Sequence, residues 1–121
     1  MISHLANVPF FREELSALHA AEWKHLYAGW DSQAAGEEFL AQKADGSLPA
    51  TLVLHEGMEL AGSVSVVFGD CPARPDLDPW LASLYVVPQR RGRGCGLELV
   101  RAAIELAAAA GSERLHVFTE T

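Results

Sequence analysis

The spacing of apolar side chains predicts two helices and a hairpin in the first part of the chain. Between residues 9 and 27, apolar side chains recur every three or four positions among acidic ones, which predicts an amphipathic helix with Pro9 near its first turn. Asp31 or Ser32 can cap a second helix that continues to about Lys43.

Two runs rich in β-branched and apolar residues follow the helical segments, at residues 51–55 and 60–68. The four residues between them, Glu-Gly-Met-Glu, suit a hairpin turn, so we expect an antiparallel pair of strands. Residues 71–79 contain three prolines, which supply no backbone donor, and this segment is expected to be an exposed loop.

The remaining pattern predicts a strand, a helix and a second strand. Residues 80–87 lack polar alternation, which is typical of a strand covered on both faces. A Gly/Arg-rich turn leads into an Ala-rich helix from about Cys95 to Ala110, and Gly111 ends it. Residues 114–119 then form a strand parallel to the first. The expected apolar face of the helix consists of Leu97, Val100, Ile104 and Ala107 or Ala108.

Length and charge narrow the classes of function. A chain of 121 residues fits a single domain, residues 1–121, of class α+β or α/β with a mixed sheet. No apolar stretch approaches the length of a membrane span and no secretory signal is recognisable, so we expect a cytoplasmic protein. The net charge of −7 argues against binding to nucleic acid or anionic lipid. Cys71 and Cys95 belong to no ligand cluster, so no metal is expected.

The turn at residues 89–96, Gln-Arg-Arg-Gly-Arg-Gly-Cys-Gly, is the strongest candidate for a binding site. Glycines between a strand and a helix let successive N–H groups converge on one anion, and the helix adds its own unpaired donors. This turn would hold a diphosphate; the alternative is a basic turn without a ligand. The turn lacks the Gly-Lys-Ser/Thr of a P-loop, and Leu97 stands where a dinucleotide fingerprint needs its third glycine.

Three features together resemble the acetyl-CoA-binding core of the GNAT N-acetyltransferases. They are Leu-Tyr-Val-Val-Pro at residues 84–88, the spacing Arg91-x-x-Gly94-x-Gly96, and the helix and strand that follow. A short strand around residues 2–5, two helices and a hairpin precede them in the family's order. The resemblance implies that the backbone of Leu84, Tyr85 and Val86 pairs with the pantetheine arm of acetyl-CoA. It also implies that the pyrophosphate is held by the amides of Arg91, Gly92, Arg93, Gly94, Cys95, Gly96 and Leu97.

The reaction implied is acetyl transfer to a primary amine of a small molecule or peptide by direct attack in a ternary complex. An amide near Val86 or Val87 is expected to stabilise the oxyanion. Candidates for the base are Glu120 and His116, weighed against Asp78 and Glu22. The acceptor pocket is expected between the first two helices and residues 71–79, where the excess of carboxylates favours a cationic amine.

GNAT proteins usually continue past the last predicted strand with another helix, which carries a Tyr that protonates the leaving thiolate, and further strands. This sequence is therefore expected to be a domain that lacks those elements. Its strand at residues 115–119 would then present an unpaired edge, which favours a homodimer or an exchange of elements between chains. Without a residue matching the Tyr, the alternative function is a CoA-binding or regulatory module with impaired catalysis.

Overall fold

Among the residues that the structure describes, four antiparallel strands form a sheet in the order β1-β2-β3-β4. The computed structural model describes residues 1–23, 48–68, 78–112 and 114–117. The strands span Ile2–His4, Ala50–Glu56, Glu59–Val67 and Trp80–Val86. The hairpin β2–β3 and the short N-terminal strand are thus confirmed. The predicted second helix at residues 31–43 and the loop at residues 71–77 lie outside the described residues.

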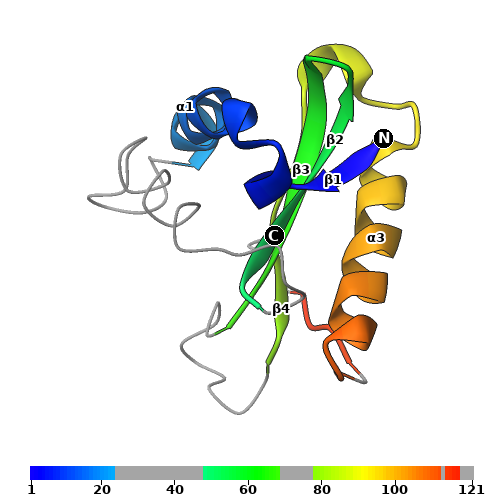
Figure 1. The fold of residues 1–121 in the computed structure, drawn as a ribbon. Helices are drawn as coiled ribbons and strands as arrows, with labels where there is room; N and C mark the ends of the chain where they lie inside the picture. The colour runs from blue at the N-terminus through cyan, green and yellow to red at the C-terminus, as the bar shows by residue number, and fades with distance from the viewer. Residues whose placement is uncertain (24–47, 69–77, 113, 118–121) are drawn as a thin grey trace.

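Two helices cover opposite faces of this sheet (Figure 1). Helix α1, Arg12–Trp23, packs on one face, where Phe11 and Leu15 meet Val53 and Leu60. Helix α3, Cys95–Ala109, packs on the other face against side chains of β2, β3 and β4. Because strand side chains alternate between faces, Leu52 and Leu54 serve the α3 core while Val53 serves the α1 core. The fold is α+β, as expected.

The predicted buried face of α3 is confirmed in part, because Ala107 is buried and Val100 packs against the core. Leu99, Ala103 and Ala107 are the fully buried positions, whereas Leu97 and Ile104 are 57% and 52% exposed. The small alanines let the helix approach the sheet closely. Gly62 of β3 makes the same approach possible, because a Cβ there would lie 3.1 Å from Leu99 Cδ1 and 2.5 Å from the Tyr85 carbonyl oxygen.

Two further predictions need correction. Pro9 lies in a separate 3₁₀ turn, Pro9–Phe11, so α1 itself begins at Arg12. The strand β4 is not covered on both faces throughout, because Ser83 and Leu84 are exposed. Ser83 has a φ of 55°, and the pairing with β3 is irregular there. The strand therefore bulges in its middle.

The parallel return strand is present as a single bridge. His116 pairs with Trp80 in parallel, with Leu81 N–H donating to His116 O at 2.7 Å and His116 N–H donating to Pro79 O at 3.0 Å. The segment after α3 therefore lies beside the start of β4. Within the described ranges, no helix is both long and apolar enough to cross a membrane.

Candidate functional site

The glycine turn between β4 and α3 has the backbone conformation that an anion site needs. A 3₁₀ turn, Pro88–Arg90, leaves β4, and Gly92 and Gly94 then adopt φ values of 80° and 82°. Gly94 is the N-cap of α3, and its carbonyl accepts the first helical bond from Glu98 N–H at 3.1 Å. A Cβ at either glycine would meet no atom within 4 Å. The turn is therefore open on its outer side.

The amides of this turn are available to a ligand. Arg91 N–H donates weakly to Pro88 O at 3.3 Å, and the next bonded amide is that of Glu98. In the described part of the chain, the intervening amides from Gly92 to Leu97 donate to no backbone acceptor. The last three belong to the first turn of α3, whose N–H groups carry the positive end of the helix dipole. These donors fit a diphosphate.

The end of β4 offers a second set of backbone groups. Tyr85 pairs with Ser63 of β3, and Val87 N–H donates to Ala61 O at 2.9 Å. Because alternate residues of an antiparallel strand turn their polar groups to opposite sides, the backbone of Val86, between Tyr85 and Val87, faces away from β3, and its carbonyl accepts from Arg91 Nε at 2.9 Å. Leu84 lies in the irregular stretch of β4, where this alternation does not apply.

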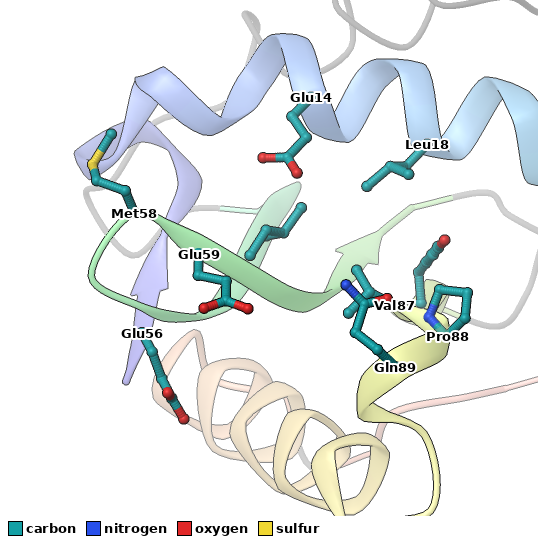
Figure 2. A pocket seen from close by; sticks show the side chains of 10 residues that line it. Glu14, Leu18, Glu56, Met58, Glu59, Val87, Pro88 and Gln89 are labelled. Carbon is teal, nitrogen blue, oxygen red and sulfur yellow. The ribbon is translucent and has the colours of Figure 1, made fainter.

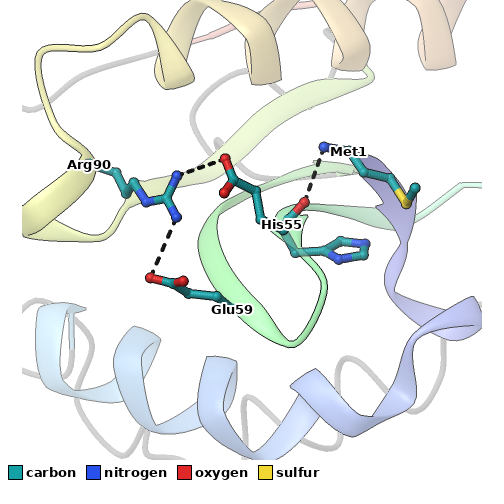
Figure 3. Close-up of polar contacts among 5 residues, drawn as sticks. Met1, His55, Glu59 and Arg90 are labelled. Atoms are coloured by element: carbon teal, nitrogen blue, oxygen red, sulfur yellow. Dashed lines mark hydrogen bonds and ion pairs between the residues drawn. The ribbon is translucent and has the colours of Figure 1, made fainter.

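The three arginines of the turn are arranged differently from one another. Arg90 pairs with two carboxylates of the β2–β3 hairpin, at 3.0 Å to Glu56 Oε1 and 3.5 Å to Glu59 Oε1 (Figure 3). Arg91 donates from Nε to Val86 O at 2.9 Å, and its guanidinium lies 5.7 Å from the centre of the Tyr85 ring. Arg93 is exposed. The three arginines of the turn are therefore not equivalent positive charges.

The ion pair perturbs both of its members. Arg90 donates a hydrogen bond to Glu56 and places a positive charge beside it, which lowers the pKa of that carboxyl. The same hydrogen bond and charge raise the pKa of Arg90 above its usual value. Both groups are therefore charged across the whole range in which the protein is expected to work.

A pocket of about 610 Å³ lies on the α1 side of the same strand end. Figure 2 shows it between α1, the β2–β3 hairpin and the turn after β4. Three carboxylates line it, from Glu14 on α1 and from Glu56 and Glu59 on the hairpin. Its other lining residues are Leu18, Met58, Leu60, Tyr85, Val87, Pro88 and Gln89. The pocket thus combines an apolar floor with an acidic rim.

His19 ties α1 to the sheet behind this pocket. Its ring is fully buried, forms a 3.0 Å hydrogen bond between Nε2 and Ser63 Oγ, and stacks on Tyr85 at 6.2 Å and 11°. Burial lowers the pKa of His19 to about 4, because the imidazolium would lose its hydration. The ring is therefore neutral near pH 7.

The predicted catalytic candidates do not converge on the turn in the described residues. His116 lies opposite Trp80, with the two rings 5.4 Å apart, and hence at the start of β4 rather than at its end. Asp78 and Glu22 are exposed. Glu120 lies outside the described residues.

Sequence reasoning found only part of the pocket. It placed Glu14 of the first helix among the carboxylates of the expected acceptor pocket, but it treated Glu56 and Glu59 only as parts of a hairpin turn. A signal existed in the placement of two carboxylates around Gly57 and Met58, because a hairpin turn projects both flanking side chains from one end of the sheet. Nothing in the sequence linked that end to Arg90.

Comparison with protein families finds a match between residues 10–121 and the family described as Acetyltransferase (GNAT) family. A comparison with curated proteins finds no match.

Solved structures share the fold. An aminoglycoside 6′-N-acetyltransferase complexed with coenzyme A is 21% identical, with a TM-score of 0.71 over 97% of this chain and 60% of the other. A GCN5-related N-acetyltransferase from Ralstonia eutropha is 22% identical, with a TM-score of 0.65 over 98% and 82%. Glucosamine-6-phosphate N-acetyltransferase from Arabidopsis thaliana is 14% identical, with a TM-score of 0.67 over 100% and 82%. This chain spans 60% of the length of the aminoglycoside enzyme.

Proposed function

Because the chain belongs to the GNAT acetyltransferase family, we propose that it transfers the acetyl group of acetyl-CoA to a primary amine of a cationic small molecule or peptide. The observation that carries this proposal is the open turn at the N-terminus of α3, whose amides from Gly92 to Leu97 donate to no backbone acceptor among the described residues. Among the described residues, no strand pairs with the outer side of β4 at Val86, directly before this turn.

The residues of this site fit acetyl-CoA without side-chain ligands. The amides from Gly92 to Leu97 would hold the pyrophosphate, and the backbone of β4 around Leu84 would pair with the pantetheine arm, since Val86 O already accepts from Arg91 Nε at 2.9 Å. When bound, acetyl-CoA supplies an activated thioester. Of the two amides considered for the oxyanion, Val87 N–H is already bonded to Ala61 O, which favours Val86 N–H.

The acidic pocket is the proposed site of the acceptor. Its three carboxylates, only two of which pair with Arg90, favour a positively charged molecule. Two structural neighbours are an aminoglycoside N-acetyltransferase and a glucosamine-6-phosphate N-acetyltransferase. Polyamines and amino sugars are therefore the first acceptors to test.

In the proposed reaction, the neutral amine nitrogen attacks the acetyl carbonyl, the C–S bond breaks and CoA leaves as its thiolate. The amine proton goes to a base; of the two candidates predicted from the sequence, His116 lies beside Trp80, at the other end of β4 from the proposed pocket, and Glu120 lies outside the described residues. No side-chain nucleophile takes part.

Turnover separates this proposal from a CoA-binding module without catalysis. The purified chain is incubated with acetyl-CoA and a panel of amines, and thiol release is measured against a neutral-amine control. Thiol release that depends on a cationic amine supports the proposal. Tight CoA binding without turnover on any amine would favour the binding module instead.

Homodimer formation remains a prediction, based on the unpaired strand edge expected at the segment around His116. Light scattering at working concentration tests it, and a monomeric mass would contradict it.

A further inference from the structure

We propose that Arg90 is a positioning residue that holds the cofactor turn in its binding conformation by fastening it to the β2–β3 hairpin. The inference rests on the proposed function, because it concerns how that turn binds CoA.

The geometry places Arg90 where it can fix the turn. Arg90 ends the 3₁₀ turn Pro88–Arg90, and only Arg91 separates it from Gly92. Its backbone N–H donates to Val87 O at 2.9 Å, and its guanidinium reaches two strands, at Glu56 and Glu59 (Figure 3). Its side chain is only 17% exposed, although both carboxylates are largely exposed. Arg90 is therefore held from both the backbone and the side chain.

The turn has few other anchors. After Val87, the backbone bonds of Arg90 and Arg91 are followed by no further bonded amide until Glu98 in the described part of the chain. The side chain of Arg91 adds one further bond, from Nε to Val86 O. Since Gly92 and Gly94 are conformationally permissive, the position of their amides depends on the residues that flank them. Arg90 contributes two of those restraints.

The charges around Arg90 allow a test in which two explanations of its role predict opposite changes in CoA affinity. If Arg90 acted on CoA only through its charge, removing the Glu56 carboxylate would leave more positive potential near the turn and tighten the binding of the anion. If Arg90 acts by position, losing Glu56 loosens the turn and weakens binding. The variant Glu56→Gln therefore distinguishes these roles, although it leaves every arginine in place.

The experiment measures CoA affinity by calorimetry for the whole chain and its variants Glu56→Gln, Glu59→Gln, Arg90→Gln, Arg90→Lys and Arg90→Gln/Glu56→Gln. Glu105→Gln, on an exposed position of α3, controls for the loss of one negative charge. Pantetheine, which lacks the diphosphate, is measured as a competitor in each case. Melting temperatures confirm that each variant is folded.

We expect Glu56→Gln to weaken CoA binding roughly two- to fivefold, the range set by an exposed ion pair, and to leave pantetheine affinity unchanged. The double variant should bind no more weakly than Arg90→Gln, because the second change removes a partner already lost. Arg90→Lys retains the positive charge but not the planar guanidinium that reaches both carboxylates. Its CoA affinity should therefore fall between those of Arg90→Gln and the wild type.

Glu56→Gln that binds CoA as tightly as the wild type, or more tightly, would overturn the inference and leave the proposed function intact. An equal loss of pantetheine affinity would also overturn it, because the effect would then not be specific to the turn. A folded wild-type chain that binds no CoA would refute the proposed function, and this inference with it.

Discussion

The glycine turn and the acidic pocket lie at the same end of β4, but they are built in different ways. The turn presents backbone amides of consecutive residues, from Gly92 to Leu97, at the start of one helix. The pocket presents side chains that come from α1, from both strands of the hairpin and from the end of β4. Changes in the turn should therefore act through backbone conformation, and changes in the pocket through charge and packing.

This difference has a consequence for how the site can vary. A backbone site tolerates most side chains as long as the glycines remain, whereas a side-chain pocket changes its preference with each substitution. The proposed cofactor and acceptor sites are then separable, apart from Arg90, whose guanidinium reaches the rim of the pocket while its backbone belongs to the turn.

The largest expected effect comes from Gly94→Asp. The change forces a side chain to adopt a φ of 82° and adds a negative charge beside the proposed diphosphate, so CoA affinity should fall roughly a hundredfold in calorimetry. Gly111→Asp is the matched control, because Gly111 has a φ of 91° and open space but lies at the other end of α3. Equal losses in both variants would show that strain rather than the turn determines affinity.

The next effect concerns His19, which joins α1 to the sheet through its hydrogen bond with Ser63. Since the folded pKa of His19 is about 4, the unfolded chain binds more protons at every pH between that value and about 6.5. The free energy of unfolding is therefore highest above this window and decreases as the pH falls through it. At pH 5 the decrease caused by His19 is roughly 2 kcal/mol. Urea unfolding at several pH values measures the slope.

His19→Gln should flatten that slope, because glutamine does not titrate. CoA affinity of the folded wild type should vary little over the same window, because the turn is built on β4 and α3 rather than on α1. An unchanged slope in the variant would contradict the assignment of this titration to His19.

A smaller effect is expected from Glu14→Gln in the pocket. Losing this carboxylate should raise the KM for a cationic amine roughly three- to tenfold and leave the KM for acetyl-CoA unchanged. Glu13→Gln is the matched control, since Glu13 is the neighbouring exposed position of α1 and does not line the pocket. A similar rise in both variants would reduce the effect to the overall charge of the protein.

The turn could be predicted from the sequence because its signal is local. Glycines between a strand and a helix constrain the backbone wherever they occur, and the apolar run at residues 80–87, which lacks polar alternation, predicted the strand before them. The prediction still missed the bulge at Ser83, because nothing in a run of apolar residues reveals an irregular register. It was also only partly right for the buried face of α3, where Val100 and Ala107 were predicted correctly but Leu97 and Ile104 were not, because alanines on every side made several faces equally plausible.

The pocket could not be predicted because its parts are distant in the chain. Arg90 and Glu56 are 34 positions apart, and only the hairpin and the end of β4 together bring them to 3.0 Å. Similarly, His19 and Ser63 are 44 positions apart. Each looked like an ordinary polar residue until the sheet placed it.

The most direct test of the account is an amide NMR titration of the whole chain with CoA. We predict that the largest chemical-shift changes occur at the amides from Gly92 to Leu97, with a second group at Leu84 and Val86 near the end of β4. Changes confined to other parts of the protein, or none at saturating CoA, would contradict the claim that this turn is the cofactor site.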